Sequence, residues 1–99
     1  MKITQSVKTE RRLTVALEGR LDSETAPQLE QQLDAALEGV TILELDFAKL
    51  EYISSAGLRL LLATQKRMNG QGEMVIKNVS KGIMEILEIT GFNGILTFE

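Results

Sequence analysis

Residues 43–62 read LELDFAKLEYISSAGLRLLL, and this stretch decides the fold. Residues 40–47, VTILELDF, form a short run that is dense in apolar and β-branched side chains. Such a run is typical of a central β-strand that is covered on at least one side. Behind Ser54 and Ser55 the apolar residues change to helical spacing, which predicts a helix that continues to Met68. The chain is therefore expected to pass from strand to helix at the serine pair.

The segments before this stretch predict two strands and a helix. Residues 2–7 and 13–18 alternate between apolar and polar side chains, which indicates two strands that can form a hairpin. A helix follows, and Thr25 and Gln28 have the spacing of a capping box at its start. Gly39 is placed where a helix ends.

The segments after it continue the alternation of strands and helices. Residues 73–78 predict a short strand, Ser80 is a candidate cap for a third helix, and residues 94–99 predict an edge strand. The expected order is therefore ββαβαβαβ. This order indicates a single α/β domain over residues 1–99, in which helices pack against a mixed β-sheet.

Composition excludes several classes of function. The chain has 99 residues, of which 43% are hydrophobic and 25% charged, as expected for one small globular domain. It has neither cysteine nor histidine, so disulfides, thiolate ligands, histidine ligands and a Ser-His-Asp triad are excluded. No spacing typical of a metal-binding loop occurs, and we expect neither a metal nor another cofactor. The net charge of −3, without a basic run, argues against nucleic-acid binding.

The beginning of the chain gives an expectation about location. The opening MKITQSVKTERRL lacks an apolar signal segment, and no apolar run approaches the length that crosses a bilayer. We therefore expect a cytoplasmic protein that does not insert into a membrane.

Three segments together resemble a known family. They are GRLDSETAPQLEQQL at residues 19–33, the stretch at residues 43–62, and NGQGEMVIKNVSKGIMEILEITGF at residues 69–92. In this order they resemble the STAS domains of bacterial anti-sigma factor antagonists. The resemblance implies a partner switch. The unphosphorylated antagonist binds an anti-sigma factor serine kinase and the sigma factor is released, phosphorylation of one serine reverses the binding, and a serine phosphatase restores it.

The resemblance also implies which residues carry the switch. The phosphorylated serine falls on Ser55, with Ser54 as a competing acceptor, because Ser54 stands where many antagonists have an aspartate. The partner-binding set that we expect is Asp22, Ser54, Ser55, Ala56 and Gly57, to which helical spacing adds Arg59 and Leu60. Local sequence alone favours a helix cap for Ser54 or Ser55, and the resemblance changes this interpretation for Ser55 but leaves Ser54 chiefly a cap candidate. Asp22 can equally bind turn amides, and Asp46 can cap the end of the central strand.

Two residues of the second helix extend this expected surface. Arg59 follows Ser55 by four residues, which puts it on the same helical face and within reach of a phosphate. The alternative for Arg59 is a solvated surface arginine. The helical period directs Leu60 away from the core side, next to Ala56, and predicts a small exposed apolar strip for partner docking. The alternative for Leu60 is an ordinary exposed leucine.

Two other functions are weighed against this reading. A serine behind a strand resembles the G-x-S-x-G elbow of hydrolases, but I-S-S-A-G lacks the first glycine, and no histidine is present to activate the hydroxyl. We therefore expect an interaction module and not an enzyme. The second alternative is a non-phosphorylated STAS subunit of a membrane transport or signalling complex, which Ser54 in place of aspartate keeps open.

Overall fold

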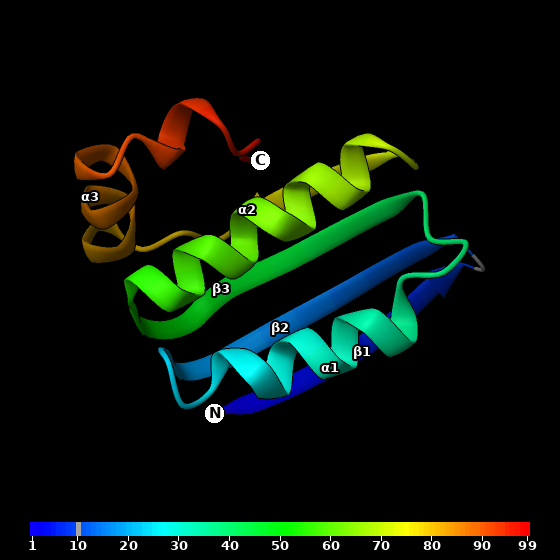
Figure 1. Ribbon diagram of the computed structural model, residues 1–99, viewed down its shortest axis with the longest axis horizontal. Coiled ribbons are helices and arrows are strands. Elements are labelled where there is room, and N and C mark those ends of the chain that lie inside the picture. Colours follow the sequence, from blue (N-terminus) through cyan, green and yellow to red (C-terminus); the bar gives the residue numbers. More distant parts are fainter. Residues whose placement is uncertain (10) are drawn as a thin grey trace.

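The fold alternates strands and helices in the expected order (Figure 1). The computed structural model describes residues 1–9 and 11–99, with the side chain of Lys8 left out. The elements are β1 (Lys2–Thr9), β2 (Arg12–Leu21), α1 (Ala26–Ala36), β3 (Ile42–Ile53), α2 (Ser55–Asn69), β4 (Glu73–Lys77), α3 (Lys81–Ile89) and the 3₁₀ turn η1 (Phe92–Gly94).

The sheet is mixed, as predicted. Its strand order is β1-β2-β3-β4, with β1 antiparallel to β2 and the β2–β3 and β3–β4 pairs parallel. The last predicted strand is present only as a short parallel pairing in which Phe98 lies opposite Ile76. Ile76 donates its N–H to the Thr97 carbonyl over 2.9 Å, and Glu99 donates to the Ile76 carbonyl over 3.0 Å. The eighth element thus extends the sheet edge beside β4.

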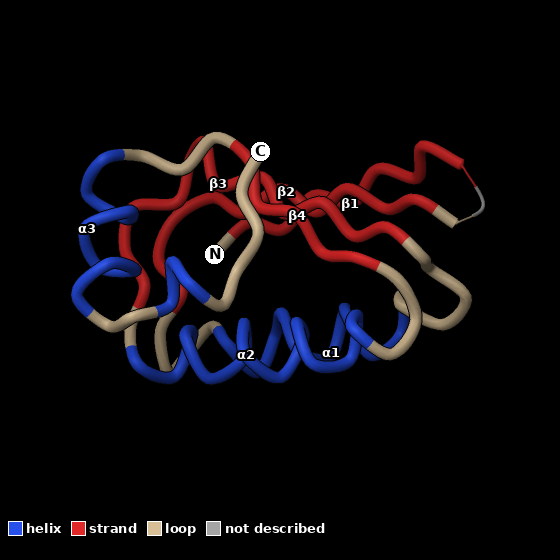
Figure 2. Tube along the Cα trace, turned by 90° about the horizontal axis from the view of Figure 1, so that it is seen from above, coloured by secondary structure: helices blue, strands red, loops and turns tan. Residues whose placement is uncertain are grey.

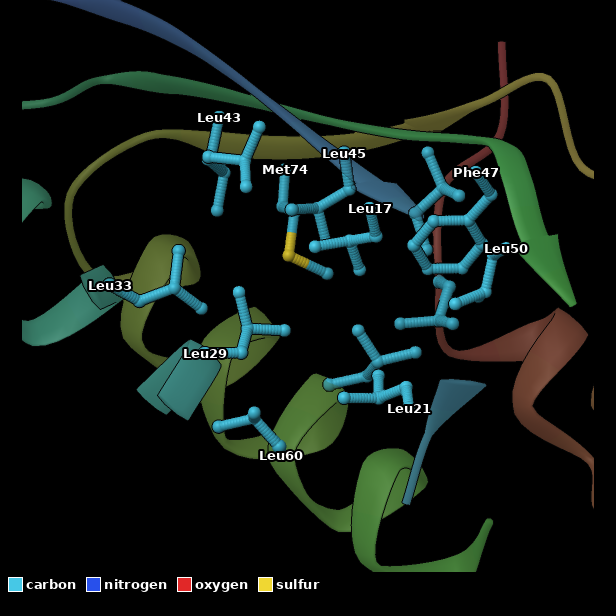
Figure 3. Packing of buried hydrophobic residues seen from close by; sticks show 14 of the residues in the cluster. Leu17, Leu21, Leu29, Leu33, Leu43, Leu45, Phe47, Leu50, Leu60 and Met74 are labelled. Carbon is cyan, nitrogen blue, oxygen red and sulfur yellow. The ribbon is translucent and has the colours of Figure 1, made fainter. Parts of the chain in front are cut away.

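Two helices cover one face of the sheet, and the core lies between the layers. Figure 2 shows α1 and α2 side by side on that face, with α3 at one end of the sheet. Strand alternation turns every second side chain toward these helices. The buried inward set includes Leu13, Val15 and Leu17 on β2, Leu43, Leu45 and Phe47 on β3, and Leu29 and Leu33 on α1. Figure 3 shows how Leu17, Leu45 and Leu29 of this set pack together. Apolar burial at these positions provides the main driving force for folding.

The starts of α1 and α3 compare differently with the predicted caps. Ser80 caps α3 as predicted, since its hydroxyl accepts from the Ile83 N–H over 3.2 Å. The capping-box prediction for Thr25 is wrong, although Thr25 is the N-cap residue of α1. Its hydroxyl instead donates to the Arg20 carbonyl over 2.7 Å and accepts from the Asp22 N–H over 2.9 Å. The Thr25 side chain therefore ties α1 to the end of β2 and does not close the first helical turn.

The opposite face of the sheet carries a buried carboxylate. Glu44, between the inward-facing Leu43 and Leu45, is 2% exposed. Its carboxylate accepts from Arg12 Nε and Nη2, each over 2.9 Å, and from Thr14 Oγ1 over 3.0 Å. Lys77 contacts the same carboxylate and reaches Glu99 Oε1 over 3.2 Å. These hydrogen bonds, above all those from Arg12, lower the pKa of Glu44 to about 2 despite its burial.

Glu44→Gln is expected to reduce the acid sensitivity of folding. Because folding lowers the pKa of Glu44 from about 4.5 to about 2, the ionised group stabilises the fold above pH 4.5. That contribution, about 3 kcal/mol in total, is lost progressively as pH falls from 4.5 to 2, and about 2 kcal/mol of it is lost by about pH 3. Urea unfolding at about pH 7 and about pH 3 should show a smaller stability difference for Glu44→Gln than for the unsubstituted protein.

The control for this experiment is Glu51→Gln, which removes an equal charge from an exposed side chain. It should keep the pH dependence of the unsubstituted protein. An identical pH dependence in the Glu44 and Glu51 variants would contradict the assigned role of Glu44.

Candidate functional site

The candidate site lies where β3 ends and α2 begins, beside the turn that links β2 to α1 (Figure 1). Leu21 and Ile53 lie opposite each other at the ends of the parallel strands β2 and β3. The Ser54 N–H donates to the Leu21 carbonyl over 2.9 Å, which joins the two turns directly. The carboxyl ends of parallel strands meet at one edge of a sheet. The topology therefore brings Asp22 and the serine pair together, although they are far apart in the sequence.

Ser54 holds the N-cap position of α2, but its hydroxyl does not cap the helix. Its φ and ψ of −97° and 178° are extended, and its carbonyl accepts the first helical bond from the Leu58 N–H over 2.9 Å. The Ser54 Oγ is buried and has no hydrogen-bond partner in the part of the chain that the structure describes. The cap interpretation is thus right for the backbone and wrong for the side chain. Burial also shields this hydroxyl from an enzyme.

Ser55 is the first residue of α2 and is exposed to solvent. Backbone N–H groups of the first helical turn have no partner within the helix, and the helix dipole is positive at this end. An anion on the Ser55 side chain is therefore compatible with the fold. Of the two adjacent serines, only Ser55 offers an accessible hydroxyl.

Asp22 organises the turn between β2 and α1. Its Oδ1 accepts from the Glu24 N–H over 3.0 Å, from the Thr25 N–H over 3.1 Å and from the Thr25 hydroxyl over 3.3 Å. The hydrogen bond from the Thr25 backbone is the main cause that lowers the pKa of Asp22, and the Arg20 guanidinium at 3.8 Å adds to it. The turn-amide interpretation of Asp22 is therefore confirmed. Its carboxylate is half-buried, which leaves part of it available to a partner.

Gly57 is buried because α2 starts close against the end of β2. A Cβ atom at this position would lie 2.8 Å from Ile53 Cγ1, 2.8 Å from Leu21 Cγ and 3.0 Å from the Leu21 carbonyl oxygen. Real Cβ contacts are longer, so any side chain here must displace its neighbours. Gly57 thus fixes how closely the serine-bearing turn sits on the sheet, and its observed role is in packing.

The prediction that Leu60 points into solvent is wrong. Leu60 is only 8% exposed, and Figure 3 shows it in the packed cluster that also contains Leu29 of α1. The helical period correctly directs Leu60 away from Leu58, but α1 packs along that flank of α2. The side chain is therefore buried between the helices, where it lines a hollow together with Leu33. Ala56 remains half-buried and Ala63 exposed beside it.

The expectation that Asp46 caps the end of the central strand is also wrong. β3 continues seven residues beyond it to Ile53. Asp46 Oδ1 instead accepts from the Ala48 N–H over 2.9 Å and from Asn78 Nδ2 over 3.0 Å. Asn78 has a φ of +58°, so this side-chain contact accompanies a left-handed backbone at the end of β4. Asp46 thus connects β3 to the turn before α3, away from the serine pair.

One pair of surface residues near the site is not among the residues predicted from the sequence. Arg20 and Tyr52 lie opposite each other on β2 and β3, and the Arg20 guanidinium carbon is 4.4 Å from the Tyr52 ring centroid. Such a contact is a favourable cation–π interaction. The strand register that brings the two residues together has no signal in the local sequence.

Other kinds of site have no support in the described ranges. Residues 1–9 and 11–99 contain no group of three or more histidine, cysteine, aspartate or glutamate side chains arranged to hold a metal ion. None of the helices in this part of the chain is both long enough and apolar enough to span a membrane.

A protein-family comparison identifies the class that this fold and site define. The model of the family described as "Mlab, STAS domain" matches residues 4–97. The chain belongs to the STAS domain family. This member of the family has a mixed sheet with two helices on one face and a serine-bearing turn at the start of α2.

Named relatives cover most of the chain. BtrV of Bordetella bronchiseptica, named as a candidate anti-sigma factor antagonist, is 39% identical over 94 residues, which is 93% of this chain and 80% of BtrV. The anti-sigma-B factor antagonist of Bacillus subtilis is 29% identical over 98 residues, which is 97% of this chain and 90% of that protein.

Solved structures support the fold. The anti-sigma factor antagonist SpoIIAA in its unphosphorylated form matches with a TM-score of 0.77 and 18% identity, over 99% of this chain and 87% of that chain. The phosphorylated form of the Bacillus SpoIIAA gives a TM-score of 0.76 at 19% identity, over 99% of this chain and 91% of that chain. At such low identity these likenesses concern the fold alone.

Proposed function

We propose that this protein is an anti-sigma factor antagonist that works by partner switching. Its unmodified form binds an anti-sigma factor serine kinase in the cytoplasm, and the sigma factor is thereby released. Phosphorylation of Ser55 by that kinase reverses the binding, and a serine phosphatase regenerates the unmodified form. The observation that carries the proposal is the exposed Ser55 hydroxyl at the first residue of α2, in a chain whose relatives are named as anti-sigma factor antagonists.

The choice of Ser55 over Ser54 rests on access. A kinase must bring the hydroxyl oxygen into contact with the γ-phosphate of ATP. The Ser54 Oγ is buried, and the Ser54 N–H is bound to the end of β2, so this hydroxyl is not presented to a kinase. The Ser55 side chain, in contrast, already faces solvent.

The effect of the phosphate follows from its charge. It adds about −1.5 to −2 charges at neutral pH, next to the unpaired N–H groups of the helix start. The domain tolerates this charge, whereas a partner docked over Ser55 would have to desolvate it. A cost of about 1.4 kcal/mol already weakens binding tenfold. A switch therefore needs no change in the fold of the antagonist.

The test uses the purified protein with the anti-sigma factor serine kinase of the same organism and ATP. Peptide mass spectrometry should locate one phosphate on Ser55, and Ser55→Ala should accept none. Calorimetry should show that the phosphorylated chain binds the kinase at least about tenfold more weakly than the unmodified chain.

Ser54→Ala is the matched control, because it alters the neighbouring hydroxyl without removing the proposed acceptor. It should still be phosphorylated. Phosphate on Ser54 instead would contradict the assignment of Ser55. A chain that carries no phosphate under any growth condition and is bound constantly to membrane subunits would favour the STAS subunit of a transport complex.

A further inference from the structure

A groove runs along the seam between α1 and α2 and opens beside the serine-bearing turn. Its larger part is a hollow of about 350 Å³ at the beginning of the two helices. Its lining includes Ala26, Glu30, Ala56, Arg59, Leu60 and Ala63. A second hollow of about 150 Å³ continues it, since Glu30, Leu60 and Ala63 line both. Ala26, Ala56 and Ala63 give the groove an apolar floor beside the buried Leu60, and the polar side chains of Ser23, Glu30 and Arg59 complete its lining.

The charges along the groove differ between its two ends. At the far end the walls are joined by an ion pair, in which Arg67 Nη1 lies 3.4 Å from Asp34 Oδ1. At the end near Ser55, Arg59 of α2 and Glu30 of α1 line the same hollow. Neither makes an ion pair with another of the residues that the structure describes. Arg59 is thus an exposed cation at the rim of an apolar hollow, four residues after Ser55 on the same helix.

We propose that this groove receives a segment of the partner kinase that places an apolar side chain on the alanine floor and a carboxylate on Arg59. The inference rests on the proposed function and specifies the chemistry of its partner. Charge complementarity supports a carboxylate, because an arginine fork with free donors pairs best with a planar anion. The apolar floor supports a partner segment over a free anion, because a small anion gains nothing from the alanine methyl groups.

The position of Arg59 links the groove to the phosphate. Residues four apart on a helix are neighbours, so a phosphate on Ser55 competes with the partner carboxylate for the Arg59 guanidinium. The phosphate on Ser55 would also lie close to the partner carboxylate and repel it. Phosphorylation therefore opposes partner binding in two ways, by adding an anion and by withdrawing the cation that the partner uses.

The first test needs no partner. The chain is prepared with phosphoserine at position 55, and the phosphate is titrated by phosphorus NMR. If Arg59 holds the phosphate, Arg59→Gln shifts the midpoint of its second ionisation to higher pH by several tenths of a unit, because a nearby cation favours the dianion. Arg67→Gln, on the same helix but paired with Asp34, leaves the midpoint unchanged. Equal midpoints in all three proteins would overturn the phosphate contact.

The second test measures binding of the unmodified and phosphorylated chains to the kinase. In the unmodified chain, Arg59→Gln should weaken binding about tenfold. Lys66→Gln, which removes an exposed cation of α2 that lines neither hollow, should weaken it less than about twofold. In the phosphorylated chain, Arg59→Gln should weaken kinase binding much less, because the Arg59 guanidinium is already paired with the phosphate. Such non-additivity is the signature of two groups that share one contact. Equal losses in both forms would overturn the competition.

The apolar floor is tested separately. Ala63→Met fills the hollow from an exposed helical position and should weaken kinase binding without loss of stability. Ala35→Met, exposed on α1 outside this groove, is the control and should bind normally. If the unmodified chain binds the kinase and phosphate abolishes binding, but Arg59→Gln behaves like Lys66→Gln, only the groove proposal fails. If the unmodified chain does not bind the kinase, both proposals fail.

Discussion

Replacing Phe47 with alanine is expected to lower the free energy of unfolding by about 3–5 kcal/mol. The Phe47 side chain is fully buried and belongs to the packed cluster, where it lies on β3 near Leu50 (Figure 3). Its removal costs the transfer free energy of the ring and leaves a cavity that the surrounding leucines fill only in part. A small domain has a total stability of about 5–15 kcal/mol, so the loss is a large part of it. Urea unfolding followed by circular dichroism measures the change.

The control for Phe47 is Ile89→Ala, at a position on α3 that is 86% exposed. It should change the free energy of unfolding by less than about 0.5 kcal/mol, because its side chain is solvated in both states. Similar losses in the two variants would contradict the assignment of Phe47 to the core.

The second large effect is expected for Gly57→Ala, which should lower the free energy of unfolding by about 2 kcal/mol. The new Cβ would lie 2.8 Å from atoms of Ile53 and Leu21, and overpacking of this kind costs about 1–3 kcal/mol. The start of α2 can relieve the clash only by moving away from β2. Because Ser55 is on the same helical turn, its phosphorylation rate should also fall. Urea unfolding and a kinase assay measure the two effects.

Gly82→Ala is the matched control for Gly57. It is also a glycine near the start of a helix, but a Cβ at this position meets nothing within 4 Å. Alanine should therefore stabilise the protein by about 0.5–1 kcal/mol through its higher helix propensity. Opposite signs for the two substitutions separate close packing from helix propensity. Stabilisation by Gly57→Ala would contradict the packing role of this glycine.

The fold could be predicted because each element has a local signal. Alternation on β2 and the helical period on α2 are repeated over several residues, and each pattern has one structural solution. The final pairing of Phe98 with Ile76 is the least regular part, because it is an isolated bridge and not a continuous strand. Its exact extent therefore depends on tertiary contacts.

The errors arose where two elements meet. The helical period of α2 predicts which residues share a face, but it does not predict that α1 packs against the face of Leu60. Leu60 is therefore buried and not exposed as predicted. Thr25 and Ser54 do hold the N-cap positions of α1 and α2, as their residue types indicate. Yet Thr25 binds the end of β2, and the Ser54 hydroxyl is left without a partner among the described residues. The Arg20–Tyr52 contact depends in the same way on strand register.

The close packing of α2 against the end of β2 bears on how fast the protein could respond to a modification of Ser55. The Ser54–Leu21 hydrogen bond and the absence of a Cβ at Gly57 hold the Ser55 backbone on a rigid part of the domain. In the proposed switch, phosphorylation of Ser55 would change the charge of this surface and not its shape, so no slow refolding step would separate the modification from its effect. The lifetime of each state would then be set by the enzymes that add and remove the phosphate and by the dissociation rate of the partner.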